Sequence, residues 1–192
     1  MVNEEKLNQI NEAASQRCSA ALSKLTNKQI QVIFSPPSIT DIKEIPFLLG
    51  SEETGSGIYL PIKGSVSGSS LLLFPKETAC NLCDIMMKRE LHTTQELCSF
   101  DEGILKEVSN IILGNYLAIL SNRLNGEIVE GMPDFSSGMF GAILEEIVTD
   151  FAKDAGEALA IKIEFMFENL KLKGYMLLLF KPEMVEALLN AL

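Results

Sequence analysis

The sequence predicts an α+β fold, in which a mostly antiparallel sheet is packed with long helices. Three observations support this prediction. Apolar residues recur at helical spacing over residues 4–25 and 100–124. Six short segments have the alternating or wholly apolar pattern of strands. These helices and strands come in blocks rather than in strict β-α-β alternation, which favours antiparallel pairing.

Both halves of the chain show the same expected order: a long helix, a strand, an irregular or helical middle, a pair of strands and a short helix. The strand segments are IQVIF, GIYLPI and SSLLLF, followed by EIVEG, ALAIKIEFMF and KLKGYMLLLF. The last segment changes from alternating charge and leucine to wholly apolar, as expected where a strand enters a core from an exposed hairpin. The remaining helical segments are ETACNLCDIMM, SSGMFGAILEEIVTDFAKDAG and PEMVEALLNAL.

Two pairs of similar segments indicate an internal duplication. Residues 68–74 (GSSLLLF) match residues 174–180 (GYMLLLF), 106 positions apart, and Ser23 in AALSKL matches Ser121 in LAILSNRL, 98 positions apart. The difference between the two offsets predicts about eight extra residues in the middle of the second copy, near the helical stretch at 136–156. We expect one pseudo-symmetric domain over 1–192, made of repeats at about 1–98 and 99–192.

Composition restricts the class of function. The chain has 192 residues, of which 47% are apolar and 22% charged, enough for a folded core. A formal net charge of -10, a pI of about 4.6 and no cluster of Lys or Arg argue against nucleic acid or an anionic membrane as a partner. The N-terminal residues lack the pattern of a signal peptide, and the apolar runs are too short to span a bilayer. We therefore expect a cytoplasmic protein with no membrane insertion.

The cysteines allow two interpretations. Cys80 and Cys83 form a C-x-x-C, a pattern found in zinc sites and thiol enzymes. A zinc site needs about four ligands, yet the chain has a single histidine, His92, and no second C-x-x-C. The same stretch reads as an amphipathic helix with cysteines among its apolar positions. We expect packed, reduced thiols and no metal or cofactor of the protein's own, with a zinc or thiol enzyme as an alternative.

The helix at 100–124 combines a buried face with an unusual polar stripe. Ser99 and Glu102 fit a capping box at its start. The expected buried residues are Ile104, Val108, Ile111, Ile112, Tyr116 and Ile119. Away from that face lies a stripe made of Gly103, Glu107, Asn110 and Gly114.

The composition of this stripe also has two interpretations. Each glycine costs a helix about 1 kcal/mol relative to alanine. That cost is reasonable if another group must approach the helix backbone closely. A glutamate and an asparagine at this spacing also fit the solvent-facing side of a purely structural helix.

The motif around this stripe resembles that of the CheC/CheX/FliY family of CheY-phosphate phosphatases, and CheC most of all. The family pattern is an acidic residue or serine, three residues, Glu, two residues, Asn, about 22 residues and Pro. Glu107, Asn110 and Pro133 match it, whereas Gly103 stands at the acidic or serine position. The flanking segments SFDEGILKEVSNIILGNYLAILSNRL and MPDFSSGMFGAILEEI resemble the C-terminal half of CheC, and the duplication covers the chain as it does there. The resemblance implies the CheC-like pseudo-two-fold fold.

The resemblance also implies a function. Glu107 would dock on a lysine of a phosphorylated CheY-like response regulator, and Asn110 would orient the water that attacks its aspartyl phosphate. The Mg²⁺ would belong to the partner. In the first repeat, Gln9 and Glu12 stand opposite Glu107 and Asn110, Gln16 stands opposite Gly114, and Pro36 is one place off its expected position. We therefore expect a degenerate first site and one active site.

The sequence is also compatible with other functions. The chain could be a non-catalytic adaptor that binds a response regulator or the receptor deamidase CheD, and Gly103 favours that alternative. It could also be a flagellar switch component like the FliM and FliY middle domains.

Overall fold

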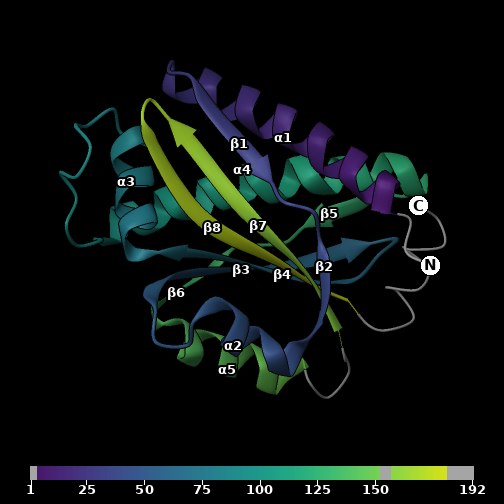
Figure 1. Ribbon diagram of the computed structural model, residues 1–192. Coiled ribbons are helices and arrows are strands. Elements are labelled where there is room, and N and C mark those ends of the chain that lie inside the picture. The colour runs from purple at the N-terminus through teal and green to yellow at the C-terminus, as the bar shows by residue number, and fades with distance from the viewer. Residues whose placement is uncertain (1–3, 152–156, 181–192) are drawn as a thin grey trace.

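The computed structural model describes residues 4–151 and 157–180 (Figure 1). The first half contains α1 (Glu4–Thr26), β1 (Ile30–Phe34), β2 (Ser38–Asp41), the 3-10 turn η1 (Ile42–Glu44), α2 (Ile45–Leu49), β3 (Thr54–Gly64), β4 (Gly68–Pro75) and α3 (Lys76–Met86). The second half contains α4 (Ser99–Leu124), β5 (Ile128–Glu130), β6 (Asp134–Met139), α5 (Phe140–Phe151), β7 (Glu157–Phe167) and β8 (Leu170–Phe180). The short helix expected at PEMVEALLNAL lies outside the described residues.

One antiparallel sheet organises these elements. Its strand order is β1-β7-β8-β4-β3-β5, with β2 also paired to β7 and β6 also paired to β3. Helices α1, α3 and α4 cover one face of the sheet, and α2 and α5 cover the other (Figure 1). Leu72 and Phe74 of β4 belong to the core under the first group, whereas Leu71 and Leu73 belong to the core under the second. Because both faces are covered, every residue of β4 between Gly68 and Pro75 is buried, including the apolar run from Leu71 to Phe74. The predicted α+β fold is confirmed.

The duplication is visible in the strand register. Leu71 of β4 pairs with Leu177 of β8, and these two residues are 106 positions apart, the offset that relates the two copies of the LLLF segment. The pseudo-two-fold axis therefore passes between them. The repeats also interlock, because β1 pairs with β7 of the second half and β5 pairs with β3 of the first. The exact repeat boundaries stay a prediction.

The predicted position of the extra residues is only partly right. Gly68 pairs with Ile62, and its counterpart Gly174 pairs with Ile163. The two partners lie 6 and 11 positions upstream, so the β7–β8 hairpin holds five of the extra residues.

The sequence also assigns residues 136–139 to a helix, which is wrong. They lie in β6, whose pairing with β3 is a long-range contact invisible to local periodicity.

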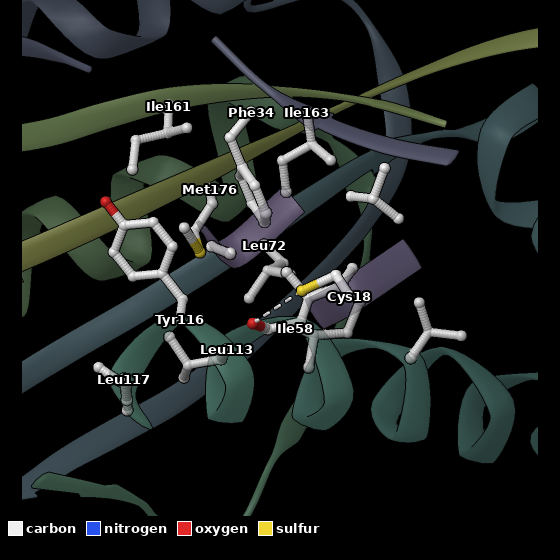
Figure 2. Packing of buried hydrophobic residues seen from close by; sticks show 14 of the residues in the cluster. Cys18, Phe34, Ile58, Leu72, Leu113, Tyr116, Leu117, Ile161, Ile163 and Met176 are labelled. Atoms are coloured by element: carbon white, nitrogen blue, oxygen red, sulfur yellow. Dashed lines mark hydrogen bonds between the residues drawn. The ribbon is translucent and has the colours of Figure 1, made fainter. Parts of the chain in front are cut away.

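Two long helices, α1 and α4, lie side by side over the main core (Figure 1). Figure 2 shows Tyr116 of α4 and Cys18 of α1 pointing into this core with Phe34 of β1. The Tyr116 hydroxyl donates a hydrogen bond to Asn11 Oδ1 of α1 at 3.0 Å. This contact and the apolar packing hold α4, which carries the polar stripe, in a fixed orientation.

Candidate functional site

Helix α4 begins one residue earlier than the predicted capping box implies. Its N-cap is Cys98, and the backbone N–H of Cys98 donates to Asp101 Oδ2 at 3.0 Å. Burial raises the pKa of Asp101, but hydrogen bonds from Cys98 and Arg89 outweigh it, so the pKa lies below its ordinary value. The prediction of Ser99 and Glu102 as the box is therefore wrong. Asp101 takes that role because it stands three residues after the N-cap, and Arg89 Nη1 lies 3.3 Å from its carboxylate.

The buried face of α4 is wider than the predicted stripe of isoleucines. Val108, Ile112, Tyr116 and Ile119 are buried as predicted, whereas Ile104 and Ile111 are only partly buried. Four leucines that the predicted stripe does not include are buried too: Leu105, Leu113, Leu117 and Leu120. The physical reason is that α4 packs against α1, α3 and the sheet at once.

The polar stripe lies on the opposite side of α4 from this core. Gly103 and Glu107 are exposed, and Asn110 and Gly114 are half-buried. In the part of the chain that the structure describes, no ion pair involves Glu107. Its carboxylate is therefore available to a cation on another molecule.

Asn110 is more enclosed than Glu107. Its Oδ1 is shielded from solvent and accepts no hydrogen bond from the described residues. A shielded amide oxygen without a donor costs about 1–3 kcal/mol, and native proteins keep few of them. Asn110 Oδ1 is thus an acceptor that is not used within the described residues. The side chain would have to rotate to bring this oxygen outward before another molecule could donate to it.

The two glycines of the stripe have different surroundings. A Cβ on Gly103 would meet no atom within 4 Å, so the helix surface there is open. A Cβ on Gly114 would lie 2.8 Å from Glu130 Oε1. Glu130 ends β5, which packs against α4. Sequence reasoning missed Glu130, because nothing local relates it to Gly114.

Beside the stripe lies a hollow of about 420 Å³. It is lined by Leu25, Met86, Met87, Ser99, Phe100, Gly103, Ile104 and Glu107. These residues come from the ends of α1 and α3 and the start of α4. The only sequence signal for this hollow was Phe100, an apolar residue at the start of the helix, three residues before Gly103.

Pro133 lies between β5 and β6, both of which contact α4. The corresponding region of the first repeat is different in chemistry. Glu12, Gln16 and Pro36 line one groove of about 670 Å³ between α1 and β1. Gln9 is exposed, and its Oε1 accepts a hydrogen bond from Arg123 Nη2 at 3.2 Å. The degenerate first site stays a prediction.

The C-x-x-C thiols lie in the core. Cys80 and Cys83 are buried, and the thiol of Cys83 donates to the Asp101 carbonyl oxygen at 3.6 Å. Burial raises the pKa of Cys83 to about 12 and also raises the pKa of Cys80. Thiols with raised pKa values are poor nucleophiles at neutral pH. Among residues 4–151 and 157–180, no cluster of three or more His, Cys, Asp or Glu side chains could hold a metal ion.

By length and composition α4 could cross a membrane, but 56% of its most apolar stretch is buried within the fold. The core helix of a soluble protein has the same properties.

Known proteins that are similar to this chain match it over most of its length. No family model matches the chain. It is 21% identical over 191 residues to the CheY-P phosphatase CheC of Bacillus subtilis, covering 97% of this chain and 91% of that protein. It is 24% identical over 160 residues to the putative CheY-P phosphatase CheC1 of Halobacterium salinarum, covering 82% of this chain and 79% of the relative.

Solved structures show the same fold. Thermotoga maritima FliY superposes with a TM-score of 0.75 at 18% identity, covering 98% of this chain and 94% of that one. The FliM middle domain from H. pylori superposes with a TM-score of 0.71 at 13% identity, covering 100% of both chains.

Proposed function

We propose that this chain, which belongs to the CheC/CheX/FliY family, hydrolyses the aspartyl phosphate of a CheY-like response regulator. The observation that carries the proposal is the stripe on α4. Glu107 offers an exposed carboxylate, and one turn away Asn110 holds an amide oxygen with no donor among the described residues. Similarity to CheC across 97% of the chain supports the choice of substrate.

The proposed mechanism assigns one task to each residue. Glu107 pairs with a lysine of the regulator and so fixes α4 over the phosphorylated aspartate. Asn110 turns its amide toward the phosphoryl group, and its oxygen accepts a hydrogen bond from the attacking water. An amide is too weakly basic to remove the proton, so Asn110 contributes position rather than general-base catalysis.

The reaction is an in-line displacement. The water oxygen forms a bond to phosphorus while the bond from phosphorus to the aspartate oxygen breaks. The aspartate leaves with the electron pair as a carboxylate, and the proton of the water passes to the inorganic phosphate or to solvent. A Mg²⁺ bound to the regulator would supply charge neutralisation. This chain needs no cofactor for the role, and the proposed site of action is the cytoplasm.

The test is the dephosphorylation rate of purified receiver domains, phosphorylated with a small-molecule donor. Asn110→Ala should lower the rate by about 100-fold or more, as removal of other oriented catalytic amides does. The matched control is Asn122→Ala, an exposed asparagine on the same helix but off the stripe. It should keep the wild-type rate. Full activity in Asn110→Ala would exclude the mechanism.

A second candidate is a non-catalytic adaptor that binds a response regulator or CheD. The shielding of Asn110 Oδ1 favours it, because the amide oxygen that the phosphatase mechanism needs is not presented outward. Gly103 favours it as well, because the family's acidic or serine side chain is absent there. Binding of a phosphorylated regulator with no change in its dephosphorylation rate would support the adaptor.

A further inference from the structure

Three exposed apolar side chains gather around the hollow beside the stripe. Leu25, Met87 and Phe100 are 52%, 39% and 58% exposed. They come from the end of α1, the residue after α3 and the start of α4, which lie at the same end of the molecule (Figure 1). Single exposed apolar residues are common, whereas a group of them around a hollow offers an apolar contact surface to another molecule.

Gly103 keeps this hollow open. It lines the hollow, and a Cβ there would meet no atom within 4 Å. Its φ is not in the left-handed region, so the backbone does not require glycine. Glycine destabilises a helix interior relative to alanine. Neither packing nor backbone conformation therefore requires glycine at position 103. The open space that Gly103 leaves beside the helix does explain it.

Glu107 lies on the rim of the same hollow, one helical turn from Gly103. An exposed carboxylate beside an apolar hollow suits a partner surface that carries a cation next to an apolar side chain. Any molecule whose lysine pairs with Glu107 must bring its neighbouring residues over the hollow.

We propose that the hollow is a docking subsite for one large apolar side chain of the phosphorylated receiver domain, adjacent to the lysine that pairs with Glu107. This inference rests on the proposed function and deepens it. Where the family pattern has an acidic residue or serine, this chain has Gly103. Because Gly103 has no polar side chain, the contact with the partner at this position is apolar rather than polar. The preference for particular receiver domains changes accordingly.

The experiment compares variants that fill or dismantle the hollow. Gly103→Leu places a helix-favouring side chain in the open space, and Phe100→Ser removes one wall. The matched control for the second is Phe47→Ser, an 86% exposed phenylalanine on α2, over the other face of the sheet. Thermal unfolding of each variant verifies that it is folded.

The readouts separate docking from chemistry. With phosphorylated receiver, Gly103→Leu and Phe100→Ser should each raise KM about 10-fold and leave kcat within about twofold, as expected for loss of uniform binding. Phe47→Ser should leave KM unchanged. Unchanged KM in both hollow variants would overturn the inference.

A binding measurement distinguishes this inference from the proposed function. The probe is the receiver domain activated with beryllium fluoride, and the quantity is its Kd for each variant. If the wild type binds but does not hydrolyse, a Kd raised about 10-fold by Gly103→Leu would support the hollow while the catalytic proposal fails. No binding by the wild type would overturn the assignment of the hollow as a docking subsite. So would self-association of the wild type that Gly103→Leu abolishes, because the occupant would then be a second copy.

Discussion

The carboxylate of Glu130 lies against the backbone of α4 at Gly114, where a Cβ would be 2.8 Å from its Oε1. Gly114 follows Asn110 by one turn, so this contact sets the surface at one end of the stripe, as the open Gly103 sets it at the other. Glycine lowers helix stability at both positions. At Gly114 it is explained by the contact with the Glu130 side chain, and at Gly103 by the free space beside the helix.

This contact predicts a dependence between the two residues. Gly114→Ala should change the free energy of unfolding by less than about 1 kcal/mol, because the gain in helix propensity is offset by displacement of the Glu130 side chain. In a Glu130→Ala background the same substitution should give the full gain of about 1 kcal/mol. Urea unfolding of the four proteins measures the coupling. Equal gains in both backgrounds would show that Glu130 does not contact Gly114 in solution.

Glu107 should contribute charge rather than shape. Glu107→Gln keeps the size of the side chain and removes the charge, so it should raise KM for phosphorylated receiver about as much as Glu107→Ala. Both variants should weaken the salt dependence of KM, because one opposite-charge pair is lost. The control is Glu127→Gln, an exposed glutamate just beyond α4. A KM near the wild-type value in Glu107→Gln would remove the proposed lysine contact.

Two serines at equivalent positions of the repeats, Ser23 and Ser121, each connect a long helix to the strand that follows it by a hydrogen bond. The Ile30 N–H donates to Ser23 Oγ at 2.9 Å, and the Ile128 N–H donates to Ser121 Oγ at 2.9 Å. Ser23→Ala and Ser121→Ala should each lower the free energy of unfolding by about 1–3 kcal/mol, since each leaves a partly buried donor without its acceptor. The effects should add in the double variant because the sites are separate. Chemical denaturation measures both, and a cost at only one site would contradict their equivalence.

The buried thiol of Cys18 makes stability fall at alkaline pH. Burial raises its pKa from 9.0 to about 12, and the thiol donates to the Ile112 carbonyl oxygen at 3.7 Å (Figure 2). Above pH 9.0 the unfolded chain loses this proton while the folded chain keeps it until about pH 12. The contribution is therefore complete below the unfolded pKa and lost as pH rises, and Cys83 acts in the same direction.

The measurement is the free energy of unfolding from about pH 8 to about pH 11. It should decline above pH 9, and the decline should be shallower in Cys18→Ala, which removes one of the protons involved. The cavity left by that substitution lowers stability by a similar amount at every pH, so the slope isolates the thiol. An unchanged slope would mean that Cys18 is not buried as a neutral thiol.

Local patterns in the sequence account for much of the architecture. Hydrophobic periodicity located α1, α4 and the long strands, because burial of one helix face or strand face leaves a local pattern. The matched LLLF segments predicted the offset that the register of Leu71 and Leu177 displays. The stripe with Glu107 and Asn110 was visible for the same reason, since residues three and four apart share a helix face.

Features that join distant segments of the chain could not be predicted in this way and are visible only in the folded protein. The interlocked pairing of β1 with β7 and of β5 with β3 depends on contacts between the repeats, which no local pattern records. The carboxylate of Glu130 at Gly114 and the hollow formed by Leu25, Met87 and Phe100 arise in the same way. Local periodicity shows which side of a helix faces outward. Which other segments border that side depends on how the whole chain packs, because side chains far apart in sequence meet there only after folding.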